Sequence, residues 1–157
     1  GKVIFRLVGE GPEKKRLKTM ANKMGLTNIS FEDPVPKQQV PQLLSQADAF
    51  IMLLKDSPVF RWGISPNKLY DYLSSGRPVI FGIRAYNNPV EEAGAGITVP
   101  PENPEKLAEA IIQLYNMGWE KRKEIGLNGR KYVEENHDFK DLVIKLEKIL
   151  FESIRKI

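Results

Sequence analysis

The feature that most constrains this chain is a regular alternation of short apolar runs with longer stretches of helical spacing. The apolar and β-branched runs occupy residues 3–8, 28–32, 49–54, 78–83 and 96–99. Strands separated by helices pair in parallel, because each helix returns the chain to the same end of the sheet. We therefore predict the α/β class: a doubly wound, Rossmann-like parallel sheet of about five strands, with helices on both faces and a helical C-terminus.

The first expected helix begins near Pro12, a residue that suits the first helical position, and ends at Gly25. Its apolar residues recur at steps of three and four, which predicts one buried face made of Leu17, Met20, Ala21 and Met24. The basic residues of the same stretch are expected to form a solvated face made of Lys14, Lys15, Arg16 and Lys18.

A second clear helix start follows the third apolar run. Ser65 is expected to cap this helix and Pro66 to open it, so that Lys68 becomes the third helical residue. The preceding run at residues 49–54 is continuously apolar, which predicts a strand that is buried on both faces.

The composition excludes several classes of protein. The chain has 157 residues, the length of one domain, and 41% of them are hydrophobic, as in soluble globular proteins. Cysteine is absent and His137 is the only histidine, which excludes a disulfide framework, a cysteine nucleophile and a histidine-rich metal site. No run reaches the ~18 apolar residues of a membrane span and no leader is evident, so we expect a cytoplasmic protein.

The charge favours acidic ligands. Lysine and arginine number 24 against 20 acidic residues, a net charge of +4 that suits nucleotides or an anionic membrane surface. Nucleic acid is not an expected partner, because the basic residues form no stripe interleaved with aromatic residues. His137 lies between two C-terminal helical stretches, so we expect it to fill that joint or to lie at the surface rather than to act in catalysis.

A glycine-rich turn marks the point where the first strand becomes the first helix. Gly9 and Gly11 flank Glu10 there, and such glycines let a phosphate approach the backbone at a helix N-terminus. The third glycine of the dinucleotide-binding fingerprint is missing. A tight turn that requires positive φ explains the same residues, and both interpretations stay open.

The stretch from Arg61 to Lys68 carries the strongest chemical signal. A cation in the first turn of a helix opposes the helix dipole at a cost of about 0.3–1 kcal/mol, and a bound anion would reverse that sign. Arg61 adds a second cation. Asp71, one turn past Lys68, can accept hydrogen bonds from a ribose diol or neutralise Lys68. Alternatively, Lys68 points into water or pairs with Asp56 or Asp71.

Five separated motifs resemble one family. They are residues 8–12 (VGEGP), 47–50 (ADAF), 65–80 (SPNKLYDYLSSGRPVI), 95–97 (AGI) and 101–107 (PENPEKL). In this order and spacing, over nearly the whole chain, they resemble the C-terminal domain of GT-B glycosyltransferases. The closest similarity is to the retaining family-four enzymes that build bacterial surface polysaccharides with aminosugars.

The resemblance implies a function and a set of site residues. Such a domain binds a nucleotide sugar, whose sugar is transferred with retention to a saccharide or lipid-linked acceptor. By this resemblance the backbone N–H groups and the ammonium of one segment hold the diphosphate, a role that falls on Gly63, Ile64, Ser65, Asn67 and Lys68. Asp71 holds the ribose, Val35 meets the base, and Gly9, Glu10 and Gly11 line the cleft. Lys68 and Arg61 offset the charge of the leaving diphosphate, without a cofactor or metal.

The sequence departs from the family pattern in two ways. The first glutamate of the family's E-x7-E pattern falls at Gly63. The chain also begins at what resembles the second strand of the domain. We therefore expect residues 1–157 to form a single donor-binding domain without its first strand and helix and without the N-terminal acceptor domain, and to be inactive in isolation. The alternative is a non-catalytic nucleotide-binding subunit that completes a split enzyme with a partner chain.

The last helical stretch carries an apolar stripe over residues 139–157. We expect Phe139 to Leu146 to pack onto the domain, and exposure or burial in a neighbouring copy only from about Ile149 onward. Three surfaces compete for the stripe: its own sheet, the absent N-terminal domain, and the inner face of the membrane. The membrane contact would be peripheral and assisted by the flanking cations Lys145, Lys148, Arg155 and Lys156.

Overall fold

The five predicted strands all form and pair in parallel, in a computed structural model that describes residues 3–154. The chain divides into two compact units, residues 1–45 and residues 46–157. The α/β class, the parallel pairing and the helical C-terminus are confirmed. The strands are shared between a two-stranded sheet in the first unit and a three-stranded sheet in the second.

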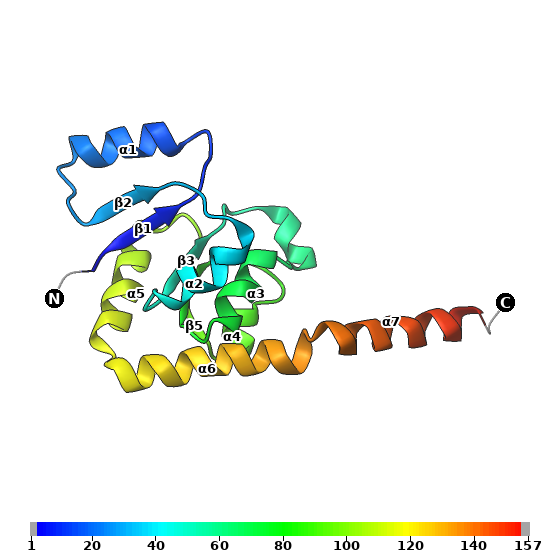
Figure 1. Cartoon of the computed structure of the whole chain (residues 1–157). Helices are drawn as coiled ribbons and strands as arrows, with labels where there is room; N and C mark the ends of the chain where they lie inside the picture. The colour runs from blue at the N-terminus through cyan, green and yellow to red at the C-terminus, as the bar shows by residue number, and fades with distance from the viewer. Residues whose placement is uncertain (1–2, 155–157) are drawn as a thin grey trace. The chain divides into compact units, whose positions relative to one another are not determined.

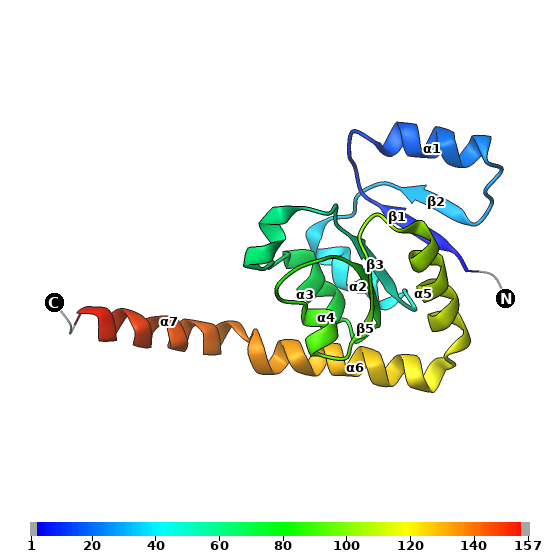
Figure 2. The same cartoon turned by 180° about the vertical axis from the view of Figure 1, so that it is seen from behind.

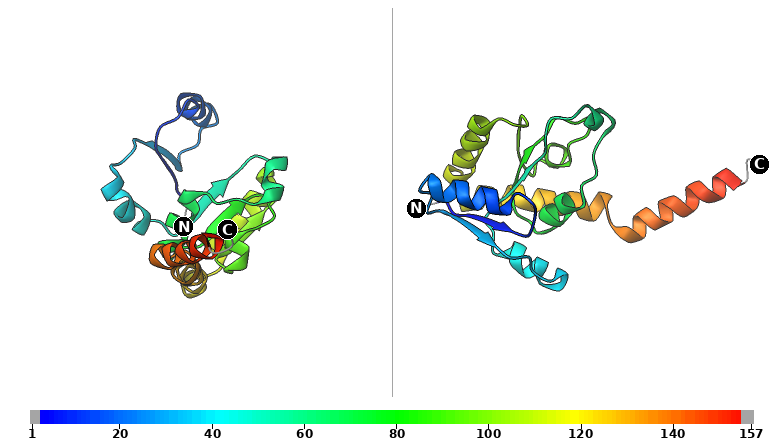
Figure 3. Two further views of the ribbon diagram at one scale, coloured as in Figure 1. Left: turned by 90° about the vertical axis from the view of Figure 1, so that its right-hand side faces the viewer. Right: turned by 90° about the horizontal axis from the view of Figure 1, so that it is seen from above.

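The first unit is a two-stranded sheet with one long helix beside it (Figure 3). Its elements are β1 (Phe5–Val8), α1 (Lys14–Lys23), β2 (Ile29–Glu32), a 3-10 turn η1 (Lys37–Gln39) and α2 (Val40–Ser45). Leu17 and Ala21 lie on the inner side of α1, but Met20 and Met24 are 46% and 64% exposed. The prediction that both methionines belong to the buried face was wrong, because two short strands cover only a narrow strip of the helix.

Lys14 also departs from its predicted place on a solvated face. Its Nζ donates hydrogen bonds to Glu10 Oε1 at 2.8 Å, Asp33 Oδ1 at 2.9 Å and the carbonyl oxygen of Glu32 at 3.0 Å. Lys14 therefore ties the glycine-rich turn after β1 to the end of β2.

The second unit contains a three-stranded sheet in the order β3-β4-β5, with helices on both faces. Its elements are β3 (Phe50–Leu53), a 3-10 turn η2 (Pro58–Trp62), α3 (Asn67–Ser74), β4 (Val79–Gly82), α4 (Pro89–Glu92), β5 (Gly96–Val99), α5 (Pro104–Asn116), α6 (Trp119–Asn136) and α7 (Phe139–Ile154).

The central strand β4 separates two apolar clusters, because successive side chains of a strand point to opposite faces. Val79 and Phe81 pack with Leu69 and Leu73 of α3, whereas Ile80 packs on the other face with helix α5. All four residues of β4 are buried. The neighbouring strand β3 is only half-buried and Leu53 is exposed, so the predicted burial of this run on both faces was wrong.

Helix α6 crosses the base of α3 with backbone contact. A Cβ atom built on Gly126 would lie 2.1 Å from the carbonyl oxygen of Gly76, just after α3. Only glycine permits this approach, which fixes the position of α3 against α6.

Helix α7 extends beyond α6, away from the three-stranded sheet (Figures 1 and 2). None of its described residues is buried, and Phe139 is 80% exposed. The predicted packing of residues 139–146 onto the domain was therefore wrong. The periodicity of the stripe was read correctly, but no element of the second unit lies opposite it. Ile157 of the predicted stripe, with Arg155 and Lys156, lies outside the described residues.

Candidate functional site

The loops that follow β3 and β4 meet at the carboxyl ends of these strands, where ligands bind in parallel α/β sheets. A surface hollow of about 550 Å³ lies there, lined by Asp56, Ser57, Pro58, Arg61, Arg84 and Ala85. Asp56 and Arg84 face each other across it with 3.3 Å between Oδ2 and Nη1. The candidate site is therefore built from the segment between β3 and α3 and from the loop after β4.

Helix α3 begins one residue later than predicted. Its N-cap is Pro66, which has an extended backbone and no side chain able to cap the helix. Ser65 is not the cap, and Lys68 is the second helical residue rather than the third. The prediction was wrong because Ser-Pro is a common helix start, whereas here Pro66 has φ −79° and ψ 117°, an extended backbone that lies outside the helix. The first turn of α3 contains no acidic residue.

Lys68 and Asp71 are both exposed on α3. Within residues 3–154, neither side chain has a hydrogen bond or an ion pair with the protein, and Asp56 pairs with Arg84 instead. The predicted alternatives in which Lys68 pairs with Asp56 or Asp71 are therefore not observed. Lys68 keeps a helix-opposing charge directed to solvent, which an anion would compensate.

Two of the five backbone N–H groups expected at the diphosphate already have internal acceptors. The N–H of Gly63 donates to the carbonyl oxygen of Phe60 at 3.0 Å, and that of Ile64 donates to Asn87 Oδ1 at 2.7 Å. The backbone N–H groups of residues 65, 67 and 68 have no acceptor within residues 3–154 and can bind an anion, whereas Pro66 has no N–H group. The open part of the predicted cradle is thus the first turn of α3 rather than the whole segment.

Asn87 is a structural residue that sequence reasoning missed. Its Nδ2 donates to the carbonyl oxygen of Ile64 at 2.9 Å, so its amide holds both polar groups of that residue. The nearby N–H of Tyr86 donates to the carbonyl oxygen of Phe60 at 3.1 Å. The position of Asn87 in the loop after a buried strand could have marked it as a candidate site residue, but nothing in the sequence predicts its pairing with Ile64.

We call the two hydrogen bonds between the Asn87 amide and the backbone of Ile64 the clamp, and this clamp requires glycine at position 63. Its φ is +104°, and a Cβ atom there would lie 2.9 Å from Asn87 Oδ1. Any side chain at position 63, where the resemblance placed the family's first glutamate, would collide with the asparagine.

Arg61 belongs to η2 and lines the hollow. Its guanidinium carbon lies 4.9 Å from the centroid of the exposed ring of Trp62. Stacking on a ring leaves the guanidinium N–H groups able to donate sideways to an oxygen anion. Arg61 and Arg84 thus bring two cations to the hollow, where Asp56 already pairs with Arg84.

Four of the predicted site residues lie in the first unit. Gly9 has φ +141°, and a Cβ atom at Gly9 or Gly11 would meet nothing within 4 Å, so the backbone of this turn is open on its outer side. Val35 is half-buried in the loop after β2. Glu10 is bound to Lys14, which makes it a structural partner of the turn.

The ion pairs around this turn shift the pKa values of their groups. The hydrogen bonds to Glu10 and Asp33 raise the pKa of Lys14, and the bond from Lys14 lowers the pKa of Asp33. At the end of β2, two hydrogen bonds from Arg6, at 2.8 and 2.7 Å, and one from Ser30 lower the pKa of Glu32 to about 2. The carboxylates of Asp33 and Glu32 are therefore charged at neutral pH.

His137 fills the joint between α6 and α7, as expected. Its ring lies 4.3 Å from that of Tyr70 and 5.5 Å from that of Tyr132, between centroids. Its buried Nε2 has no hydrogen-bond partner among the described residues. The hydroxyl of Tyr132 donates to Glu92 Oε2 at 2.8 Å. The pKa of Tyr132 is raised to about 12, mainly by burial and secondly by this hydrogen bond.

Residues 3–154 contain no group of three or more His, Asp or Glu residues that is arranged to hold a metal ion. None of the helices in this part of the chain is both long and apolar enough to cross a membrane.

Comparison with known proteins identifies the family. The family model described as "Glycosyl transferases group 1" matches residues 2–117. The chain belongs to the group 1 glycosyl transferases.

Two curated proteins are similar to this glycosyl transferase chain. WcaI of Escherichia coli (strain K12), described as a candidate glycosyl transferase of colanic acid biosynthesis, is 30% identical over 115 residues, which are 71% of this chain and 28% of that protein. The uncharacterised glycosyltransferase MJ1069 of Methanocaldococcus jannaschii is 24% identical over 154 residues, 98% of this chain and 38% of that protein. The chain thus spans well under half the length of both relatives.

Solved structures share the GT-B fold. Sucrose-phosphate synthase from Thermosynechococcus elongatus superposes with a TM-score of 0.79 at 19% identity, over 97% of this chain and 39% of that one. Anabaena HepE in complex with UDP-glucose gives a TM-score of 0.73 at 19% identity, over 99% of this chain and 41% of that one. At these identities the likeness establishes the fold.

Proposed function

We propose that this chain is the C-terminal, donor-binding domain of a glycosyltransferase, which binds a nucleoside-diphosphate sugar at the start of α3. The single observation that carries the proposal is Lys68, an exposed cation in the first turn of α3 with no hydrogen-bond or ion-pair partner among the described residues. Arg61, which lines the adjacent hollow, supports it, as does the complex of the structurally similar Anabaena HepE with UDP-glucose.

The proposed reaction breaks the bond between the sugar C1 atom and the diphosphate oxygen. The electron pair of that bond leaves on the nucleoside diphosphate, the acceptor hydroxyl oxygen bonds to C1 with retention of configuration, and the hydroxyl proton is released. Lys68 and Arg61 are proposed to offset the growing negative charge of the diphosphate, which is the usual role of cations in such sites. No metal is needed for this step.

The proposal extends to the parts that the resemblance requires. A saccharide or lipid-linked acceptor would be held by an N-terminal domain, and the reaction would take place in the cytoplasm. Asp71 is proposed to hold the ribose. The 157-residue chain by itself should not transfer sugar, because positioning the acceptor supplies many kcal/mol of catalysis.

Titration calorimetry with UDP, GDP and ADP tests the proposed donor site. Lys68→Ala should weaken binding of the preferred nucleoside diphosphate by ~1.5–3 kcal/mol, the range for hydrogen bonds to charged groups. Lys106→Ala is a matched control, because Lys106 also lies in the first turn of a helix but is paired with Glu109 at 2.7 Å. Equal affinities for wild type and Lys68→Ala would refute the site.

A further inference from the structure

The net positive charge of the chain lies entirely within the first unit. Residues 1–45 contain eight lysines and arginines against four acidic residues, whereas residues 46–157 contain sixteen of each. The +4 of the whole chain is therefore the charge of the smaller unit. Such an asymmetry indicates a surface for an anionic partner rather than general solubility.

Helix α1 concentrates this charge. Five of its ten residues are lysine or arginine and none is acidic. Lys14 is turned inward to Glu10 and Asp33, and Arg16 pairs with Glu13 at the exposed start of the helix. The side chains of Lys15, Lys18 and Lys23 have no hydrogen bond or ion pair within residues 3–154. Lys18 interacts with Asp33 only at a distance, through its charge, and Lys15 and Lys23 are exposed.

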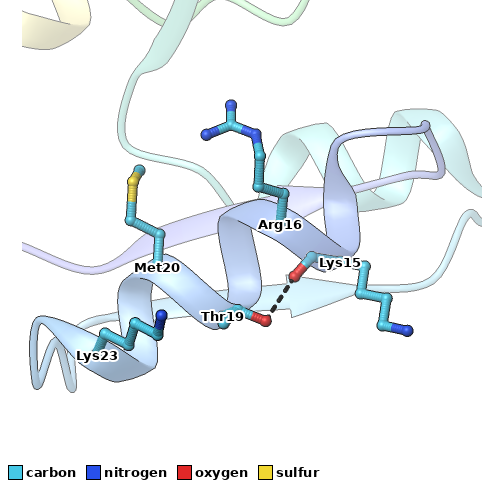
Figure 4. Close-up of a pocket in the computed structure, with 5 residues that line it drawn as sticks. All are labelled: Lys15, Arg16, Thr19, Met20 and Lys23. Atoms are coloured by element: carbon cyan, nitrogen blue, oxygen red, sulfur yellow. Dashed lines mark hydrogen bonds between the residues drawn. The ribbon is translucent and has the colours of Figure 1, made fainter.

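The outer face of α1 combines these cations with apolar surface. Lys15, Arg16, Thr19, Met20 and Lys23 surround a hollow of about 430 Å³ (Figure 4). The hydroxyl of Thr19 is turned back to the carbonyl oxygen of Lys15, at 3.0 Å, so it offers little to a polar ligand. Met24 and Leu26, the latter 43% exposed, continue the apolar surface next to Met20.

We propose that the outer face of α1 docks on the surface of a membrane that contains anionic lipids. A helix that lies in the headgroup region places its basic side chains against lipid phosphates and its apolar side chains against the acyl boundary. The exposed thioethers of Met20 and Met24 gain an apolar environment there, which water and an acidic solute do not provide.

Other anionic surfaces fit less well. Single-stranded nucleic acid is bound through stacked aromatic side chains, and α1 has none. Helix α7 also exposes many apolar side chains, but its three lysines are balanced by three acidic residues. The net positive charge of α1 therefore favours it as the contact with an anionic membrane, whereas α7, which carries the C-terminal stripe, has no net charge.

Sedimentation of the 157-residue chain with lipid vesicles tests the proposal. The chain should bind vesicles of phosphatidylcholine mixed with phosphatidylglycerol, bind pure phosphatidylcholine weakly, and dissociate as salt is raised. Each cation near an anionic surface contributes about fivefold in partitioning, so the triple variant Lys15→Gln, Arg16→Gln, Lys23→Gln should lower it about 100-fold. Met20→Ser should lower it roughly tenfold.

Matched controls assign the effect to α1. The triple variant Lys121→Gln, Lys123→Gln, Lys131→Gln removes the same charge from exposed positions of α6 and should bind as wild type. Ile112→Ser, at an exposed site of α5, controls for Met20→Ser. Equal losses in both triple variants would overturn the proposal. So would binding that survives the α1 changes but is lost in Phe151→Ser on α7, or preference for single-stranded RNA over vesicles.

Discussion

Removing the Asn87 amide should loosen the segment that leads into α3. The amide accepts from the N–H of Ile64 at 2.7 Å and donates to its carbonyl oxygen at 2.9 Å. Each such bond contributes ~0.5–1.5 kcal/mol net, and Ile64 is half-buried, so its backbone groups are only partly rehydrated. Asn87→Ala should therefore lower the free energy of unfolding by ~1–3 kcal/mol.

Thermal unfolding followed by circular dichroism measures this effect. A loss of that size corresponds to a fall in Tm of roughly 2–10 °C for a chain of this length. Asn128→Ala is a suitable control, because its amide makes a single long contact of 3.4 Å to the carbonyl oxygen of Gly94. The control should change stability by no more than ~0.5 kcal/mol.

Gly63→Ala sharpens the test. In the wild-type background the new Cβ atom would lie 2.9 Å from Asn87 Oδ1, and it would also carry the strain of φ +104°. Asn87→Ala removes the collision but not the strain, so the two substitutions should be less destabilising together than the sum of their separate effects. A Tm for Asn87→Ala equal to wild type, or strict additivity in the double variant, would refute the clamp.

Three further predictions concern the rest of the fold. Because the pKa of Glu32 falls from its ordinary 4.5 to about 2 in the folded chain, its stabilising contribution should be complete above pH 4.5 and disappear as the pH falls toward 2. In urea titrations the free energy of unfolding of Glu32→Gln should therefore decrease less steeply with falling pH than that of the wild type, and parallel curves would contradict this. His137→Phe keeps the ring contacts with Tyr70 and Tyr132 and removes a buried unpaired nitrogen, so stability should stay the same or rise by ~1 kcal/mol, and a clear fall in Tm would count against it. Gly126→Ala should cost more than ~4 kcal/mol because its Cβ atom would lie 2.1 Å from a backbone oxygen, whereas Gly11→Ala, in open space, should be neutral, and similar stabilities for the two variants would exclude the close approach.

The sequence by itself determined the class of fold and the family. Alternating apolar runs and helical spacings located all five strands, because burial on a sheet leaves a local mark in the chain. Asn103 before Pro104 is a local helix-start pattern of the same kind, and its side chain accepts from the N–H of Lys106 at 2.9 Å. The five motifs named the glycosyl transferase family, since they record local requirements of turns and helix ends.

Periodicity did not reveal which apolar faces would find a partner. Met20, Met24 and the stripe of α7 have the spacing of buried residues, yet they are exposed because no element of their own unit lies opposite them. Local spacing measures amphipathicity, and burial needs a second surface.

The tertiary structure alone decided the contacts that shape the candidate site. Asn87 binds Ile64 across 23 positions, Arg84 binds Asp56, and Lys14 joins two strand ends. These are long-range pairs between short polar side chains and loops, with no repeat that a linear pattern can display. The sequence could therefore place Lys68 at a helix start, while the packing of two loops decided which N–H groups beside it remain free.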